Sequence, residues 1–372
     1  EILTDVPVGT WEGNQKHLSS CVGYFIWRDI QYGDRGELFP VLIVINGVAV
    51  SPADPDWACA KLHFQVADAN VHETCSHLYG AHFAMEPIAV ATGRFLPPTH
   101  PVRRLLTPHF RFLLFNNDLG KNRLVNPGGF VDRLLASSLS GSLELVKRAA
   151  NNFDFTKQAF GNDCIERGMD NTIALPHYPY RDDGLLLWTA IGTYVSKFIT
   201  EHYADVKVLL ADLNLLQWWS ALSSSKEANL NGIPVDRTIE NLVFILQRII
   251  FTSGPYHAAV NFPQYEYMAF TPNMPLSAYE AFPASVLRTL PPYTQVAKQL
   301  EVMEILTSYR HDEFGNYSEE DRATFSKKEQ SILDSFQSQL DKTEKIIMAR
   351  NKVRRIPYHY LLPSLIPNST SV

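Results

Sequence analysis

The most continuous apolar pattern in the sequence runs from Trp57 to about Thr92. Its apolar residues do not keep to one face, so the pattern predicts a long helix that is buried on every side. Pro97, Pro98 and Pro101 follow, and they indicate the end of the helix because proline cannot continue its hydrogen-bonding pattern. We therefore expect this segment to be a central helix of the fold.

A second apolar stretch, Asp236–Asn261, predicts another long central helix, and Pro263 marks its end. Ser318–Arg350 differs, because its apolar side chains form one stripe and its other residues are charged or polar. That pattern predicts a solvent-facing helix packed on the core. Shorter amphipathic runs predict helices at Phe130–Ala150, Gly184–Tyr203, Val206–Leu222 and about Gln295–Ser308.

The two ends of the chain have other patterns. Residues 1–56 are rich in Gly, Pro and Asp and contain short β-type runs such as Phe39–Ile45. The tail, Ile356–Val372, is apolar and interrupted by prolines, although chain ends usually fray unless something holds them. With no internal repeat or convincing linker, we predict a single, mainly α domain over residues 1–372. It would have strands and loops in 1–56 and a helical core with the tail in 57–372.

Composition narrows the classes of function. The apolar share of 45% allows a sizeable core, and the net charge of -6 without a basic stripe argues against nucleic-acid binding. The four cysteines lack disulfide or metal spacing, and the first residues lack a secretory pattern. The longest apolar run is too short to span a bilayer. We expect a cytoplasmic protein that does not bind nucleic acid.

Two histidines inside the first apolar helix, His77 and His82, are five residues apart. On a regular α-helix this spacing points the side chains about 140° apart, whereas a π-type bulge would bring them onto one face. His257 and Asn261 in the second helix share a face because they are four apart. Three imidazoles with a carboxylate suit non-haem iron, with zinc as the alternative. The anionic ligand could be any Asp or Glu, or the α-carboxylate of Val372, which is costly to bury unless it is paired.

Longer motifs carry a resemblance to a known family. In chain order they are HETCSHLYGAHFAMEP (72–87), ATGRFLPPTHPVRRLLTPHF (91–110), LPHYPYRDDGLLLW (175–188), HAAVNFPQYEY (257–267) and IPNSTSV (366–372). Together they resemble a lipoxygenase catalytic domain, and the similarity extends from about Asp29 to the last residue. The resemblance implies a helical catalytic fold with two long central helices and a small β element near the N-terminus.

The resemblance also implies a ligand set. His77, His82 and His257 would bind iron, Asn261 would be a weak or water-mediated ligand, and the carboxylate of Val372 would be the last ligand. The family usually ends in isoleucine, but valine keeps the main-chain carboxylate. Three further histidines are predicted to form hydrogen bonds at helix ends or turns instead: His72, His100 and His109.

Five other positions match functional positions of the family. Glu73 and Gln264 correspond to hydrogen-bonding residues that link the iron to the substrate channel. Leu124 and Leu306 correspond to apolar residues that clamp the reacting methylene. Gly120 corresponds to a small residue that correlates with stereochemistry, and glycine there resembles R-specific members. From the sequence alone, Gly120 could also be an ordinary turn glycine and Glu73 a paired helix carboxylate.

The function that the resemblance implies is dioxygenation of polyunsaturated fatty acids of the linoleate or linolenate type to hydroperoxides, with R specificity. The expected partners are the fatty acid and O2. We expect a monomer or one part of a fusion protein, and leave a peripheral membrane contact open. One alternative is a zinc hydrolase, although the chain lacks the HExxH spacing that supplies a general base. The other is a non-catalytic or inactive lipid-binding fragment.

Overall fold

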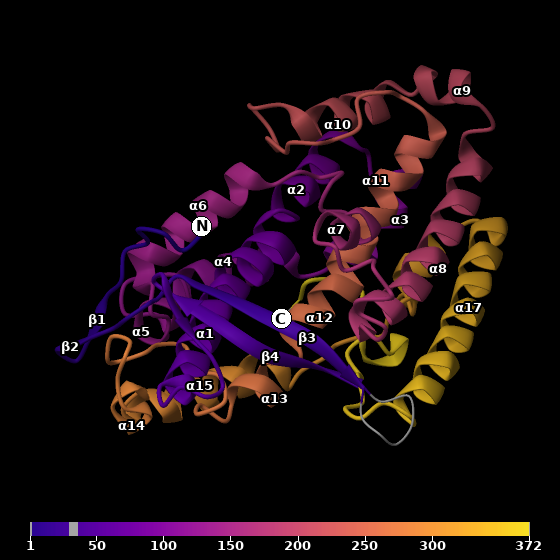
Figure 1. The fold of residues 1–372 in the computed structure, drawn as a ribbon. Coiled ribbons are helices and arrows are strands. Elements are labelled where there is room, and N and C mark those ends of the chain that lie inside the picture. The colour runs from indigo at the N-terminus through magenta and orange to yellow at the C-terminus, as the bar shows by residue number, and fades with distance from the viewer. Residues whose placement is uncertain (1, 30–35, 372) are drawn as a thin grey trace. The chain divides into compact units, whose positions relative to one another are not determined.

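The computed structural model describes residues 2–29 and 36–371 (Figure 1). Helices predominate and strands are few, so the predicted mainly α fold is confirmed. The chain divides into two compact units. The first unit contains Glu1–Gly80, Asn117–Asn151 and Val260–Tyr309, and the second contains Ala81–Asn116, Asn152–Ala259 and Arg310–Val372. The single domain stays a prediction. No helix within the described residues is long and apolar enough to cross a membrane.

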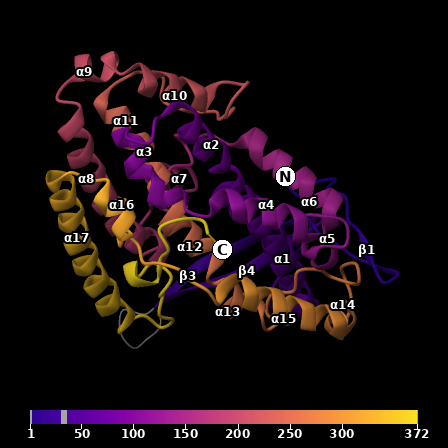
Figure 2. The same cartoon turned by 180° about the vertical axis from the view of Figure 1, so that it is seen from behind.

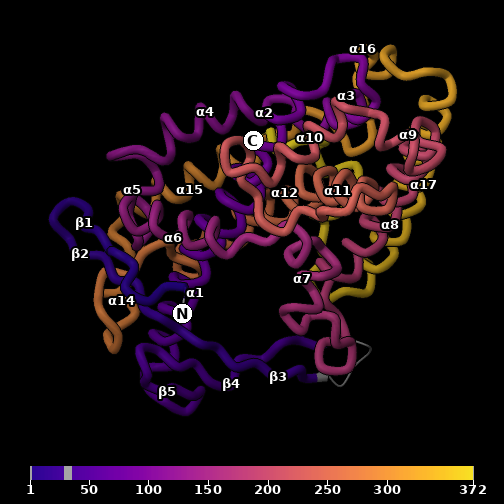
Figure 3. The backbone as a smooth tube through the Cα atoms, turned by 90° about the horizontal axis from the view of Figure 1, so that it is seen from above, coloured from indigo at the N-terminus to yellow at the C-terminus, as the bar shows by residue number. Residues whose placement is uncertain are grey.

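An antiparallel sheet near the N-terminus belongs to the first unit. In sheet order its strands are β3 (Cys21–Asp29), β4 (Gly36–Ile45) and β5 (Val48–Val50). Asn46 and Gly47 have φ of 49° and 85° and form the tight turn between β4 and β5, which Asn-Gly favours. Ile43 and Ile45 are buried against Ala60. The predicted strand at Phe39–Ile45 is therefore confirmed, and Figure 3 shows β3 and β4 running side by side.

The first long apolar segment contains three successive helical elements. They are α1 (Trp57–Val71), the π-helix η1 (His72–Phe83) and α2 (Glu86–Phe95). Val66, Ala69 and Ile88 are fully buried, as the pattern predicted. The helical segment ends just before Pro97, and the π-helix is much longer than the single bulge expected from the histidine spacing.

The second long apolar segment is interrupted in the same way. Its elements are α11 (Ile239–Phe251), the π-helix η3 (Thr252–Tyr256) and α12 (His257–Asn261). The Thr238 hydroxyl accepts a hydrogen bond from the Asn241 backbone N–H (3.1 Å) and caps the start of α11. Pro255 lies inside η3 and has no N–H to donate, so the regular α-helical hydrogen bonding cannot continue through it.

In the second unit, α8 (Pro179–His202) packs on both α11 and α17 (Lys327–Asn351), and Figures 1 and 2 show α17 running alongside α8. The buried stripe of α17 consists of Leu333, Phe336, Leu340 and Ile347. Phe336 stacks on Tyr194 of α8, with 4.5 Å between ring centroids and 8° between ring planes. The amphipathic helix predicted at Ser318–Arg350 is confirmed on this face.

Three predicted helical runs are divided by residues that cap or end a helix. The run predicted at Phe130–Ala150 becomes α5 (Phe130–Leu134) and α6 (Ser138–Asn152). The run predicted at Val206–Leu222 becomes α9 (Val206–Ala211) and α10 (Leu213–Ser223). The run predicted at Ser318–Arg350 becomes α16 (Glu319–Ala323) and α17. Asp212 accepts the Leu215 N–H (3.0 Å) at the start of α10, and Ser326 forms a capping box with Glu329 at the start of α17.

The remaining elements are shorter or lie between these. They are β1 (Thr10–Trp11), β2 (Asn14–Gln15), α3 (Pro101–Leu106), η2 (Thr107–Phe110), α4 (Leu113–Arg123), α7 (Phe160–Glu166), α13 (Gln264–Met268), α14 (Val286–Thr289), α15 (Tyr293–Thr307) and η4 (Pro363–Leu365). The segment Pro108–Gly129 mixes apolar residues with loop-forming Asn and Gly, and it contains the helix α4. The tail after η4 is buried from Ile366 to Thr370, so the expectation that something holds it is confirmed.

Candidate metal centre

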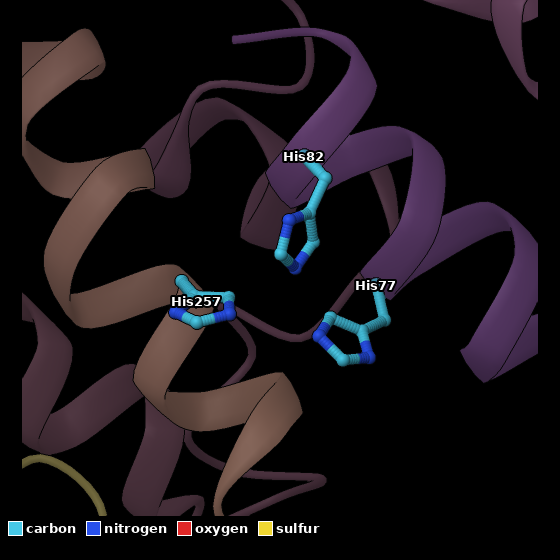
Figure 4. Close-up of side chains that lie close together, drawn as sticks. All are labelled: His77, His82 and His257. Atoms are coloured by element: carbon cyan, nitrogen blue, oxygen red, sulfur yellow. The ribbon is translucent and has the colours of Figure 1, made fainter. Parts of the chain in front are cut away.

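Three imidazole rings come together from the two interrupted helices. His77 and His82 belong to η1 and His257 begins α12. One ligand nitrogen from each lies within 4.8 Å of the others, and Figure 4 shows the rings facing a common point. The rings of His82 and His257 meet edge to face, with centroids 4.9 Å apart and planes at 87°. The expected grouping of the three histidines is thus present.

The π-helix explains how a spacing of five residues can serve one site. Its hydrogen bonds join residue i to i+5, so residues five apart are close on one side of the helix. His77 and His82 have this separation within η1. The expectation that this helix is not a straight α-helix at the histidines is confirmed.

Gln264 links His77 to Asn261. The Asn261 side chain is fully buried, and its amide oxygen accepts a hydrogen bond from Gln264 Nε2 at 3.0 Å. Gln264 Nε2 also lies 3.3 Å from His77 Nδ1. The Asn261 amide nitrogen donates to the carbonyl of Leu306 at 2.8 Å. The contacts therefore connect the predicted residues His77, Gln264, Asn261 and Leu306, and they fix the orientation of the Asn261 amide.

Glu73 approaches the same edge of the His77 ring, with its carboxylate oxygen 3.5 Å from Nδ1. A histidine that binds metal through Nε2 carries its proton on Nδ1, and a carboxylate near Nδ1 stabilises that tautomer. Burial raises the pKa of Glu73, while the nearby His72 lowers it. The position of Glu73 fits a residue that orients a ligand, which is the role that the resemblance implies.

The chemistry of the donor set suits a transition metal. Burial lowers the pKa of His77 to about 4, so this imidazole is neutral at neutral pH and keeps a lone pair for a metal. His257 is fully buried. A buried group of imidazoles favours iron or zinc over calcium or magnesium, which prefer oxygen ligands. The residues present therefore fit the iron that the resemblance implies.

Gly120 and Leu124 lie together at the end of α4. Gly120 is inside the helix, so the alternative of a turn glycine is wrong. The Leu124 N–H donates to the Gly120 carbonyl at 2.7 Å. Among the described residues, and apart from the backbone of its own helix, a methyl group added to Gly120 would have only Leu124 Cδ1, at 4.0 Å, as a neighbour. Leu306, on α15, packs against a buried apolar cluster that includes Met274 and Met303.

The predicted ligand Val372 lies outside the described residues. The three other histidines form hydrogen-bonding contacts. His100 accepts the Val102 N–H (3.2 Å) at the start of α3, and His72 Nε2 lies 2.9 Å from the Val260 carbonyl. His109 Nδ1 lies 2.8 Å from the carbonyl of Asn368 in the tail. Sequence reasoning assigned His109 a hydrogen bond but missed Asn368 as its partner, because the two residues are far apart in the chain.

A model of the lipoxygenase family matches residues 44–359 of this chain. The chain belongs to the lipoxygenase family. This lipoxygenase chain is 34% identical over 369 residues to a linoleate 9/13-lipoxygenase of Pseudomonas aeruginosa, covering 91% of the chain and 53% of that protein. It is 32% identical over 366 residues to an allene oxide synthase-lipoxygenase protein of Plexaura homomalla, covering 91% of the chain and 34% of that protein.

Solved lipoxygenases share the fold. The crystal structure of a coral 8R-lipoxygenase matches with a TM-score of 0.92 and 29% identity, covering all of this lipoxygenase chain and 58% of that one. A lipoxygenase crystallised anaerobically with arachidonate matches with a TM-score of 0.91, 29% identity and the same coverage. The chain thus spans roughly half the length of these relatives.

Proposed function

We propose that this chain carries the catalytic centre of a non-haem iron lipoxygenase that adds O2 to polyunsaturated fatty acids. The observation that carries the proposal is the meeting of His77, His82 and His257 on two interrupted helices. Family membership supports it, as do the names of relatives that act on linoleate or on polyunsaturated fatty acids.

The histidines would hold the iron together with Asn261 and the carboxylate of Val372. Iron bound there would supply the one-electron oxidation that removes a hydrogen atom from a methylene between two double bonds. Glu73 would keep the His77 ring in place by accepting a hydrogen bond from Nδ1–H, and Gln264 would orient the Asn261 amide through its 3.0 Å hydrogen bond.

Apolar residues would position the substrate. Leu124 and Leu306 would hold the reacting methylene, and the apolar cluster behind Leu306 would exclude water from it. By the family resemblance, Met274 stands where some plant lipoxygenases have an arginine that is proposed to pair with the fatty-acid carboxylate. Met274 is buried in the same apolar cluster. We therefore propose that the fatty-acid carboxylate is not held by a cation at this position. Gly120 would leave room for O2 to reach the radical on the face that gives R hydroperoxides.

The deciding experiment combines metal analysis with turnover. We expect about one iron per chain, oxygen uptake with linoleate, and conjugated-diene absorbance from the hydroperoxide. Chiral chromatography of the product would then give its carbon position and hand. Stoichiometric zinc without iron would favour the hydrolase, and an iron-loaded chain that binds linoleate without oxygen uptake would favour the lipid-binding alternative.

Gly120→Ala tests the proposed stereochemistry. Of the side chains that the structure describes, the added methyl group meets only Leu124, at 4.0 Å. We therefore expect an intact fold and a shift of the product from R towards S or to another carbon. Gly93→Ala is the matched control, because Gly93 is also inside a helix and an added methyl group would have no described neighbour beyond its own helix within 4 Å. The product profile of each variant is read by chiral chromatography. An identical profile for Gly120→Ala and the parent chain would remove Gly120 from the proposed mechanism.

A further inference from the structure

Basic side chains are concentrated at the C-terminal end of α17 and in the loop that follows it. Residues 341–357 contain six basic and two acidic residues, although the whole chain has a net charge of -6. One of the acids, Glu344, accepts hydrogen bonds from the Ser364 N–H (2.8 Å) and hydroxyl (2.6 Å). Three lysines of the stretch are exposed and form no ion pair with any residue that the structure describes: Lys342, Lys345 and Lys352. Their charges are therefore open to an external anion.

These three lysines lie on the side of α17 opposite its buried stripe. Residues three, four or seven apart share a face of a helix, and Lys342, Lys345 and Lys352 are separated by three and seven residues. Lys352 follows the last helical residue but keeps helical backbone angles (φ -64°, ψ -25°). Ile346 and Met348 lie beside the lysines and are 44% and 50% exposed. Figures 1 and 2 show α17 at an edge of its unit, so the lysine face is turned to solvent.

The loop after α17 has a fixed shape because the two other arginines of the stretch hold it on α8. Arg350 and Arg354 both bind the fully buried carboxylate of Asp183, with nitrogen–oxygen distances of 2.8 and 2.6 Å. The Asn351 side chain closes the loop by two hydrogen bonds of 2.9 Å with the backbone of Tyr358. The arginines are thus neutralised, and the residues between and after them are presented on a preformed turn.

Two aliphatic side chains point outward from this turn. Val353 and Ile356 are 66% and 70% exposed, and they follow the exposed cations Lys352 and Arg355 in the sequence. The helix dipole favours cations at the end of α17, but it does not account for aliphatic groups in water, which forgo the stabilisation of burial. Cations beside exposed aliphatic groups are typical of surfaces that bind a bilayer, where the cations meet anionic head groups and the aliphatic groups meet acyl chains.

A lipid surface suits these side chains better than a nucleic acid does. Sites for single-stranded nucleic acids stack the bases on aromatic side chains, whereas Val353 and Ile356 are aliphatic. We infer that residues 342–357 form a docking surface for an anionic phospholipid bilayer. The three lysines bind lipid phosphate groups, and the two aliphatic side chains enter the boundary between head groups and acyl chains. Docking needs no metal, so the inference is independent of the proposed function.

The first test measures co-sedimentation of the whole chain with vesicles of phosphatidylcholine, either alone or mixed with phosphatidylserine. The chain should bind the mixed vesicles, and added salt should weaken the binding because it screens exposed charges. A triple variant should bind them at least about 10-fold more weakly, since each cation near an anionic surface contributes about fivefold. Its substitutions are Lys342→Gln, Lys345→Gln and Lys352→Gln.

A second triple variant is the matched control. It replaces three exposed lysines of the same unit that lie outside residues 342–357, so its net charge changes by the same amount. Its substitutions are Lys157→Gln, Lys197→Gln and Lys226→Gln. This control should bind the mixed vesicles as the parent chain does. All six positions are exposed, and thermal unfolding should show that both triple variants are folded.

The aliphatic part of the surface is tested separately. Val353→Ser with Ile356→Ser should weaken binding to the mixed vesicles at least about 10-fold, because two aliphatic side chains no longer enter the bilayer. The salt dependence should stay the same, since no charge is removed. Leu213→Ser with Val235→Ser is the matched control, because these side chains are 69% and 79% exposed but lie outside the docking surface. The control should bind as the parent chain does.

Four results would overturn the inference. They are equal binding to vesicles with and without phosphatidylserine, equal losses in the two lysine variants, parent-like binding by the first serine variant, and binding to single-stranded RNA but to neither kind of vesicle. The last result would assign the basic surface to nucleic acid. Vesicle binding is measured without turnover, so an inactive or iron-free chain that docks on anionic vesicles would contradict the proposed function alone.

Discussion

The helical segments η1 and α17 differ in their winding and in the side chains that they bury. α17 has a capping box, a regular α-helical course and one buried stripe, so each feature stabilises the fold. In η1 the course is π-helical, and the buried polar residues Thr74 and His77 lie within it. The Thr74 hydroxyl must donate to the Asn70 carbonyl at 2.6 Å to be accommodated.

The comparison separates two features: the buried stripe of α17 follows from the packing of apolar side chains, and the π-helical winding of η1 is related to the metal centre. A stripe at α-helical spacing is enough to bury Leu333 and Phe336. Nothing in the packing of apolar side chains requires a π-helix, which is rare in proteins and frequent at functional sites. The winding of η1 brings His77 and His82 onto one side of the helix. Substitutions in the two segments should therefore have opposite effects on metal binding and stability.

The largest effect is expected from His82→Gln in η1. The variant should lose its iron and all oxygen uptake, because one of three imidazole ligands is gone. The metal-free chain should keep its stability within about 1 kcal/mol, since glutamine has a similar size and remains polar. Metal analysis and urea unfolding of the metal-free chain provide the two readings. Full iron occupancy of the variant would contradict the assignment of His82 in η1 as a metal ligand.

Phe336→Ala in α17 should give the opposite result. Loss of the ring that stacks on Tyr194 leaves a cavity and should cost about 3–5 kcal/mol of unfolding free energy. Iron content per folded chain should be unchanged, because Phe336 contacts Tyr194 and Phe314 but no candidate ligand. Urea unfolding and metal analysis below the unfolding transition test both points. Loss of iron from the folded variant would show that the two regions are coupled.

A smaller effect is expected from acid at the start of α17. Burial alone would raise the pKa of Glu329, but hydrogen bonds from Arg104, Ser326 and His202 outweigh it and lower the pKa to about 2. Because the usual value is 4.5, this carboxylate stabilises the folded chain above about pH 4.5. The contribution is lost as the pH falls towards about 2.

Glu329→Gln isolates this contribution. The unfolding free energies of the parent chain and the variant should differ most above about pH 5 and converge as the pH falls to about 2. Urea unfolding across that range measures the difference. A gap that stays constant with pH would mean that Glu329 acts through its capping hydrogen bond and not through its charge.

Local patterns predicted much of the fold and part of the site. The apolar run from Trp57 and the spacing of His77 and His82 predicted a buried, irregular helix, because both depend on neighbours in sequence. Helix capping is also a local feature, but the break between α9 and α10 at Asp212 was not predicted. The reason is that an aspartate can lie equally well on the polar face of one continuous helix. The roles of Val372, Leu124, Leu306 and Gly120 remain predictions.

The contacts of the tail could not be predicted from such patterns. His109 and Asn368 are 259 residues apart, and Asp312 and Asn368 are 56 apart. Hydrophobic periodicity reports which face of an element is buried, but it does not report which distant residue accepts a hydrogen bond. The same limit explains why a hydrogen-bonding role for Gln264 was expected only through the family resemblance, and why its contacts with His77 and Asn261 were not predicted.

The separation of His109 and Asn368 also orders the events of folding. Contacts that close very long loops are slow to form, because the chain entropy is lost before any contact rewards it. We therefore expect the contacts of Asn368 with His109 and Asp312 to form late in folding. The segment from Ile366 to Thr370 would then be among the last parts of its unit to become ordered.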